Sequence, residues 1–165
     1  MMYNYVMKKL IIFLLFAAIA ASCFGQSKKQ PAFSPDTDML SLMNEAKKLM
    51  KYRDDIALPD IQPTTEEHLK SLVCNGVKYC PVSAVYFRNT VYYKQDMNLS
   101  DPLSKSILVH EFIHHIQANS GFLASNCNVW YSNEKQAYRL QAKYLRNNDQ
   151  DDSFIHEALR IIKCK

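Results

Sequence analysis

The sequence predicts an α+β domain in which a small antiparallel sheet packs on helices and disulfides add stability. Two segments rich in valine, tyrosine and phenylalanine, 82–87 and 90–94, are separated by Arg88-Asn89, which is typical of a β-hairpin. Longer segments on both sides carry apolar residues at helical spacing. These helical segments are 35–52, 102–119 and 133–146.

The first 25 residues have the layout of a secretory signal peptide. Lys8 and Lys9 precede an apolar run over 10–21, which ends in small residues. The run is shorter than the about 20 apolar residues that a membrane-spanning helix needs. We therefore expect an exported protein of bacterial type, located in the periplasm or outside the cell.

Two modes of processing fit this N-terminus. Cleavage after Gly25 would leave a polar linker over 26–34 and a single domain over 35–165. Alternatively, Cys23 would be lipidated, because residues 20–23 loosely resemble a lipobox. Only in the second case do we expect a lipoprotein that is anchored to a membrane.

The charge of the chain indicates no nucleic-acid partner. The formal net charge is +4. It falls to +2 when Lys8 and Lys9 leave with the signal peptide, because 18 of the 20 basic residues then remain together with 16 acidic ones. No block of like charges occurs along the sequence, and a nucleic-acid-binding surface normally shows one.

Four cysteines follow Cys23, an even number in a chain that we expect to be exported. Four cysteines allow three pairings. We predict that Cys74–Cys80 closes a short loop and that Cys127–Cys164 ties the C-terminal tail to the middle of the chain. The rival interpretation is a zinc-binding cysteine cluster, but the sequence has no C-x-x-C spacing.

The segment before the hairpin is predicted to hold two helices with a break between them. Ser34-Pro35 offers an N-cap with proline at the first helical position, and apolar residues then recur at helical spacing as far as residue 52. Pro59 and Pro63 are expected to break the chain. A short second helix over 65–73 is expected to follow.

Three helices are predicted after the hairpin. Asp101-Pro102 is a helix start, with an N-cap and a proline at the first helical position. A loop that contains Cys127 and Trp130 leads to Ser132, which is predicted to cap the next helix. The predicted helices cover 102–119, 133–146 and about 154–163.

Residues 110–114, His-Glu-Phe-Ile-His, form the motif H-E-x-x-H in the middle of a predicted helix. Because His110 and His114 are four positions apart, both imidazoles project from one helix face and can reach one Zn²⁺ ion. Glu111 lies beside that face, where it can take a proton from a metal-bound water. The alternative, a chance match on a helix surface, is disfavoured by the helical context and the expected export.

A catalytic zinc usually takes three protein ligands and one water, so the third ligand must come from elsewhere. Glu134 is favoured because it opens the next predicted helix, 20 positions after His114, and a helix–loop–helix of that length can fold back on one ion. His115 points about 100° away from His114 on a helix and is expected in the core. His156 is the main competitor, and Glu157 is a further candidate.

This arrangement resembles the gluzincin clan of metallopeptidases, the thermolysin-like proteins. In that clan the H-E-x-x-H helix is followed by a helix that carries a glutamate ligand, commonly within an Asn-Glu-x-x-Ser/Ala pattern. Residues 133–137, Asn-Glu-Lys-Gln-Ala, match this pattern, and the resemblance covers about 90–146. It implies a zincin-like fold and a zinc ion, with the ligands His110, His114 and Glu134 and the general base Glu111.

The chain departs from the clan in the group that holds a ligand histidine. Thermolysin-like enzymes carry an aspartate four positions after the glutamate ligand, where this chain has Tyr138. Ligand histidines normally need such a partner. Gln117, one helical turn after His114, and Asn133 are candidates, although each could also be an ordinary exposed amide.

The clan also places a β-strand beside the active-site helix, and the substrate backbone pairs with the edge of that strand. The segment 90–94 precedes the helix and could serve in this way, which would imply an extended peptide substrate. A purely structural strand is the alternative for this segment.

We therefore expect a secreted zinc-dependent peptidase that acts on a peptide or protein. Glu111 would take a proton from the zinc-bound water and deliver it to the leaving amine. A further donor would stabilise the transition state, and sequence alone leaves four candidates open. These are Tyr131, Tyr138, Arg139 and His156. The alternatives are an inactive secreted zinc-binding protein and a disulfide-stabilised interaction module without metal.

Overall fold

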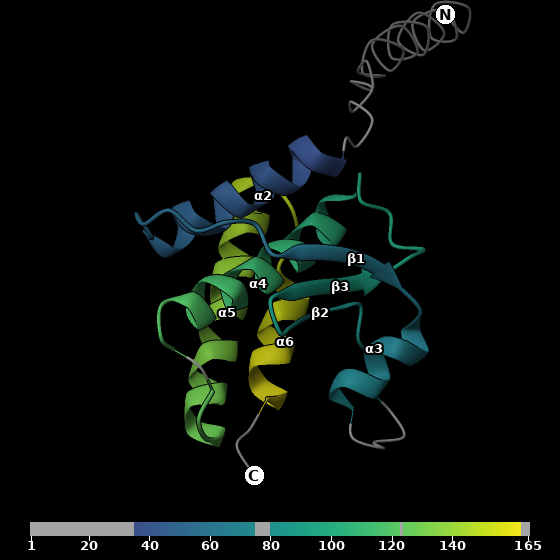
Figure 1. The fold of residues 1–165 in the computed structure, drawn as a ribbon, viewed down its shortest axis with the longest axis vertical. Coiled ribbons are helices and arrows are strands. Elements are labelled where there is room, and N and C mark those ends of the chain that lie inside the picture. Colours follow the sequence, from purple (N-terminus) through teal and green to yellow (C-terminus); the bar gives the residue numbers. More distant parts are fainter. Residues whose placement is uncertain (1–34, 75–79, 123, 163–165) are drawn as a thin grey trace, which may run out of the picture. The chain divides into compact units, whose positions relative to one another are not determined.

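A computed structural model describes residues 35–74, 80–122 and 124–162 of the chain. They form five helices and a three-stranded sheet, an α+β arrangement as predicted (Figure 1). The predicted signal peptide, the linker and Ser34 lie outside the described residues. The elements are α2 (Pro35–Met50), β1 (Asp60–Thr64), α3 (Glu66–Val73), β2 (Ala84–Phe87), β3 (Thr90–Lys94), α4 (Pro102–Asn119), α5 (Cys127–Asn147) and α6 (Ser153–Ile161).

Strands β2 and β3 form the predicted antiparallel hairpin, with Phe87 opposite Thr90. The two loop residues, Arg88 and Asn89, have φ angles of 49° and 66°. Positive φ at both positions is the pattern of a type I′ turn, whose twist matches that of the two strands. The hairpin prediction is therefore confirmed.

The purely antiparallel sheet that we predicted is wrong, because β1 joins β3 in parallel and makes the sheet mixed. The chain does not break at Pro63, which pairs with Tyr93 inside β1. A proline has no N–H for a strand ladder, but it is tolerated here because β1 lies at the edge of the sheet.

The strand order β1-β3-β2 also corrects the expected role of β3. Segment 90–94 was the candidate edge for pairing with substrate. It is the central strand, so both of its edges are already paired. Among the described residues the outer edge of β2 is unpaired, and β2 lies against α4.

Helix α4 passes through the middle of the fold and contacts α2, α5 and both hairpin strands. Asp101 caps it by accepting a hydrogen bond from the Ser104 N–H, and Pro102 occupies the first turn, as predicted. Five of its apolar side chains have no exposed surface. These are Leu108, Val109, Phe112, Ile113 and Ile116. Close packing of these apolar side chains fixes the position of α4, and with it the positions from which its polar side chains project.

Helix α5 begins earlier than predicted. It starts at Cys127, where the Asn126 side chain accepts a hydrogen bond from the Val129 N–H. Ser132 is therefore not the N-cap, and Trp130 lies in the helix rather than in a loop. The earlier start places Glu134 about two turns into α5, where it faces α4 instead of opening the helix.

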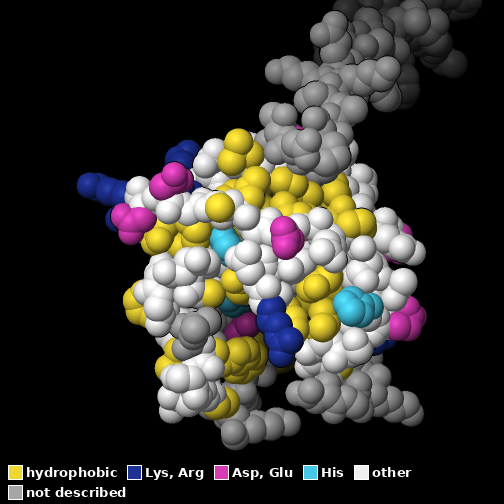
Figure 2. Space-filling model, in the orientation of Figure 1, with side chains coloured by type: hydrophobic (Ala, Val, Ile, Leu, Met, Phe, Trp, Pro, Cys, Tyr) yellow, Lys and Arg dark blue, Asp and Glu magenta, His cyan; other side chains and the backbone are white. Residues whose placement is uncertain are grey.

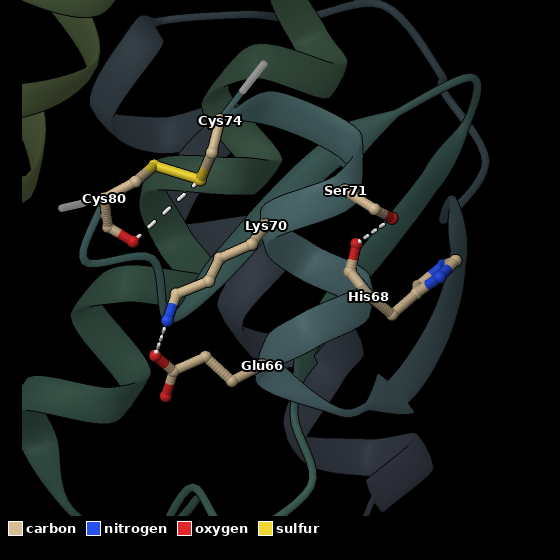
Figure 3. The surroundings of a disulfide bond; sticks show 6 residues. All are labelled: Glu66, His68, Lys70, Ser71, Cys74 and Cys80. Carbon is tan, nitrogen blue, oxygen red and sulfur yellow. Dashed lines mark hydrogen bonds and ion pairs between the residues drawn. A yellow bond between two sulfur atoms is a disulfide. The ribbon is translucent and has the colours of Figure 1, made fainter. Parts of the chain in front are cut away.

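The predicted disulfide Cys74–Cys80 is present and joins the end of α3 to the segment that leads into β2 (Figure 3). Near it, Lys70 and Glu66 form an ion pair of 2.6 Å along α3. The other predicted pairing, Cys127–Cys164, involves Cys164, which lies outside the described residues. None of the helices described has the length and apolar content needed to cross a membrane.

Candidate metal centre

Three side chains from α4 and α5 converge on one point. The Nε2 atoms of His110 and His114 lie 3.1 Å apart, one helical turn from each other on α4. The Glu134 carboxylate of α5 faces both, with one oxygen 3.3 Å from His114 Nε2 and the other 3.5 Å from His110 Nε2. Ligand atoms held 2.0–2.2 Å from a tetrahedral zinc lie about 3.4 Å from one another. The spacing of these three groups therefore fits a single metal ion.

The other candidates for a third ligand lie elsewhere. His156 is 66% exposed on α6, and its Nε2 is 3.6 Å from Asp152. Glu157 is exposed on the same helix and forms an ion pair with Arg160. His115 is buried on a different face of α4, where its Nε2 donates to the Ala57 backbone oxygen at 2.9 Å.

A glutamine amide holds the far side of the His110 ring. The Ser106 hydroxyl donates to the Leu103 backbone oxygen at 2.7 Å, so the Ser106 oxygen can only accept from the amide nitrogen of Gln141, 3.0 Å away. This orients Gln141 Oε1 toward His110 Nδ1 at 3.1 Å, and Nδ1 must carry the proton. In the neutral ring, His110 Nε2 then carries a lone pair that is directed toward Glu134.

His114 is held in the same way by Gln117. The Gln117 amide nitrogen donates to the Asn133 backbone oxygen at 3.1 Å and to Gln136 Oε1 at 2.9 Å. Its Oε1 therefore accepts from His114 Nδ1 at 2.8 Å, so that in the neutral ring Nε2 again carries a lone pair. Gln117 was one of two predicted partners, and Asn133 contributes only its backbone oxygen, since its side chain donates to Phe122 O.

Gln141 was not predicted. It lies seven positions after Glu134 on α5, so the two side chains share one helix face two turns apart. That spacing is the only signal of its role that the sequence contains. Two neutral amides thus do for these histidines what a carboxylate does in many metal sites.

The four facing atoms carry lone pairs and need a cation between them. Without a metal, that cation is a proton. Burial opposes the charge on His114, but hydrogen bonding to Glu134 and the charges of Glu134 and Glu111 raise its pKa to about 9. Burial also opposes the charge on Glu134, yet hydrogen bonds to the two histidines hold its pKa well below its usual range. The cluster is therefore built to take up positive charge.

Glu111 lies beside the three facing groups but is held by a different element. Its Oε2 accepts a hydrogen bond of 2.7 Å from the Tyr86 backbone N–H of β2. Glu111 is 8% exposed and lines the same cleft as the two histidines. One carboxylate oxygen is thus fixed by the strand, and the carboxylate remains at the cleft.

Only one of the four candidate transition-state donors reaches this cleft. The Tyr138 ring packs edge-on against the His110 ring, with centroids 4.5 Å apart, and lines the cleft. Burial, together with the charges of Glu134 and Glu111, raises the pKa of Tyr138 to about 12, so its hydroxyl stays protonated. The remaining candidates do not line the cleft; they are Tyr131, Arg139 and His156.

The cleft above the centre has a volume of about 940 Å³ and is bounded by the end of α3, β2, α4, α5 and α6. On the face drawn in Figure 2, acidic and histidine side chains lie recessed between hydrophobic ones. This volume is at the upper end of the range for small-molecule pockets. The site is therefore open to a ligand considerably larger than water.

The fold and this site define an α+β protein with a candidate metal centre in an open cleft. The chain belongs to the family DUF6647, described as a domain of unknown function, whose family model matches residues 39–162. The matched region contains the whole centre and the cleft. No curated protein and no solved structure matches the chain.

Proposed function

We propose that this protein is an exported zinc-dependent peptidase. One observation carries the proposal. The imidazoles of His110 and His114, each held by a glutamine amide, face the carboxylate of Glu134, and the carboxylate of Glu111 lies beside them. Three ligands of this kind leave a fourth position for water, as in catalytic zinc sites. A purely structural zinc would need a fourth protein ligand, and no other His, Cys, Asp or Glu of the described residues joins the cluster.

Zinc is favoured by the ligand types and their spacing. Two imidazole nitrogens and one carboxylate form a ligand set that catalytic zinc uses, whereas calcium and magnesium prefer oxygen ligands. The order of an H-E-x-x-H helix and a helix with a glutamate ligand also supports the proposed relationship to the gluzincins and a zincin-like fold. The export signal remains part of the proposal, and the Cys74–Cys80 disulfide agrees with an oxidising compartment.

Each side chain of the site has a distinct role in this mechanism. A zinc ion would polarise the substrate carbonyl and lower the pKa of a bound water to about 7. Glu111 accepts the proton of that water and transfers it to the leaving amine, while the Tyr86 N–H keeps the carboxylate oriented. Tyr138 donates a hydrogen bond to the oxygen on which negative charge develops.

Strand β2 is the element that we propose for binding the substrate backbone. In an antiparallel pair, alternate residues direct their N–H and C=O groups away from the partner strand. The backbone N–H of Tyr86 points away from β3, because it donates to Glu111. The backbone groups of Ala84, two positions earlier, point the same way. Ala84 lines the cleft, so its backbone groups can pair with an extended peptide.

Substitution of Glu111 tests the proposal. Purified Glu111→Gln protein should bind one zinc as the wild type does, because Gln keeps the size of the side chain and is not a ligand. It should lose cleavage of a quenched casein-derived peptide mixture, which the wild type cleaves and a chelator stops. Glu157→Gln, an exposed carboxylate outside the cleft, is the matched control and should keep full activity.

The outcomes separate the proposal from its alternatives. Bound zinc without any chelator-sensitive cleavage by the wild type would favour an inactive zinc-binding protein. Absence of zinc after purification without chelator, together with no binding on titration, would favour an interaction module without metal. Wild-type cleavage by the Glu111→Gln protein would remove Glu111 from the mechanism.

A further inference from the structure

The described side chains that line the cleft of the candidate metal centre are almost entirely uncharged. Among the described residues that line the cleft, the only charged ones besides the histidines are Glu111 and Glu134, and no lysine, arginine or aspartate lines it. Glu134 faces the two histidines, and Glu111, which accepts from the Tyr86 N–H, is the general base of the proposed mechanism. The described lining of the cleft therefore offers no further charge to a ligand.

The same cleft gathers exposed apolar side chains from several elements. Of the seven large apolar side chains that are exposed in the described residues, four line it. They come from the end of α3, the segment after α4, the first turn of α5 and the start of α6. These four are Val73, Phe122, Trp130 and Phe154. Apolar groups that remain exposed around one opening mark a surface that binds apolar groups.

From these two observations we infer that the cleft takes an internal, uncharged and apolar segment of an extended polypeptide and excludes chain ends. This inference rests on the proposed peptidase function and names the substrate class of that site.

The exclusion of chain ends follows from the cost of an unpaired charge. Successive residues of an extended chain lie about 3.4 Å apart, so an enzyme that removes one or two residues must hold the terminal charge close to the metal. A free α-carboxylate would need a lysine or arginine there, and a free α-ammonium would need an uncommitted carboxylate. The described lining supplies neither, and a charge without a partner is disfavoured in a partly desolvated cleft.

The open edge of β2 limits where the substrate backbone can pair. Because Glu111 occupies the outward N–H of Tyr86, the strand can donate to a substrate only from Ala84 and the residues before it. By the same alternation, Val82 is the next outward position, two residues before the Ala84 start of β2. The substrate backbone therefore pairs along 82–84, in the cleft that also holds the four exposed apolar side chains.

A set of matched peptides tests the inference on the zinc-loaded protein. The reference is a short acetylated and amidated peptide of Ala, Leu and Phe. Its relatives carry one Lys or one Glu next to the scissile bond, or are shortened so that a free amino or carboxyl end adjoins that bond. We expect each charge to lower kcat/KM by about 10-fold or more.

Binding can be measured separately from cleavage. Trp130 is the only tryptophan of the chain and lines the cleft, so its fluorescence should change when a peptide binds. The zinc-loaded Glu111→Gln variant would hold the peptides without cutting them. It should bind the blocked apolar peptide at least about 10-fold more tightly than the charged relatives.

A charge placed in the wall provides the gain-of-function control. Phe154→Lys puts a cation in the cleft, whereas Ile161→Lys changes a 67% exposed residue of the same helix that does not line it. Phe154→Lys should reduce or reverse the ratio of kcat/KM for the blocked apolar peptide to kcat/KM for the Glu-containing peptide. Ile161→Lys should leave this ratio unchanged. A wild-type protein that cleaves free-ended or charged peptides as well as the blocked one overturns the inference alone. A protein that cleaves none of them overturns the peptidase proposal.

Discussion

The Oε1 atom of Gln141 lies 3.1 Å from Nδ1 of His110, and this contact sets which nitrogen of the ring faces Glu134. Its orientation depends on a chain of hydrogen bonds that starts at a backbone carbonyl of α4 and passes through Ser106. The three side chains in this series of hydrogen bonds, Ser106, Gln141 and His110, are buried, so water cannot easily replace a missing partner. The contact is thus a structural basis for the metal affinity that we propose.

Replacing Gln141 should weaken metal binding without removing a ligand. We expect Gln141→Leu to raise the zinc Kd by about 10–100-fold, because His110 loses the acceptor that fixes its tautomer and ring orientation. Gln141→Glu keeps an acceptor oxygen and should bind zinc at least as tightly as the wild type. Competition with a chromophoric chelator measures these constants. Gln150→Leu, an exposed glutamine, is the control, and equal Kd values for Gln141→Leu and wild type would contradict the assigned role.

The metal-free protein should lose stability as the pH rises. Burial disfavours the charged form of His114, but Glu134 and Glu111 raise its folded-state pKa from the ordinary 6.5 to about 9. Because the folded pKa exceeds the unfolded one, this contribution is complete below about pH 6.5 and disappears as the pH passes about 9. The loss should be at most about 3 kcal/mol. Urea unfolding with chelator present, at a series of pH values, measures it.

Two controls identify the source of that pH dependence. Zinc-loaded protein should not show the loss, because the metal replaces the proton between the same atoms. Metal-free Glu134→Gln should show a flatter profile, since the partner charge is gone. A metal-free wild type whose stability is constant or increases over this pH range would contradict the prediction.

Local patterns were sufficient to predict the elements that carry the H-E-x-x-H motif. Helix α4 begins at Asp101-Pro102 and ends at Asn119, as the cap and the apolar spacing indicated. The two-residue loop at Arg88-Asn89 predicted the hairpin, and the six-residue separation of Cys74 and Cys80 predicted their disulfide. These features depend on neighbours within a few residues, which a sequence displays directly.

Features that depend on distant partners could not be predicted in this way. Strand β1 contains a proline and a single large apolar residue, Ile61, and exists because β3 provides its parallel partner. Gln141 is an ordinary amide in sequence, and becomes a partner of His110 only when α5 packs on α4. Glu134 could be proposed from its motif, but its orientation required the early start of α5 at Cys127.

Removing the Tyr138 hydroxyl should slow the reaction and leave the metal in place. Tyr138→Phe keeps the ring that packs on His110, so zinc affinity should stay within about twofold of the wild type. Loss of one donor to the developing oxyanion should lower kcat by about 100-fold with a smaller effect on KM. Tyr131→Phe is the matched control, because Tyr131 contacts Lys135 and does not line the cleft. Unchanged kcat for Tyr138→Phe would exclude the hydroxyl from the reaction.

Removing the Cys74–Cys80 disulfide should affect stability more than metal binding. A bond that closes a loop of six residues stabilises the fold by about 2 kcal/mol in the chain-entropy model, so the Cys74→Ala, Cys80→Ala double variant should lose about that much free energy of unfolding. Zinc affinity should hardly change, because all three ligands lie on α4 and α5. Activity should fall further than zinc affinity, since the bond fixes the segment before β2 and β2 orients Glu111. Urea unfolding, chelator competition and peptide cleavage measure the three quantities, and an equal loss of zinc affinity and activity would contradict the role of β2.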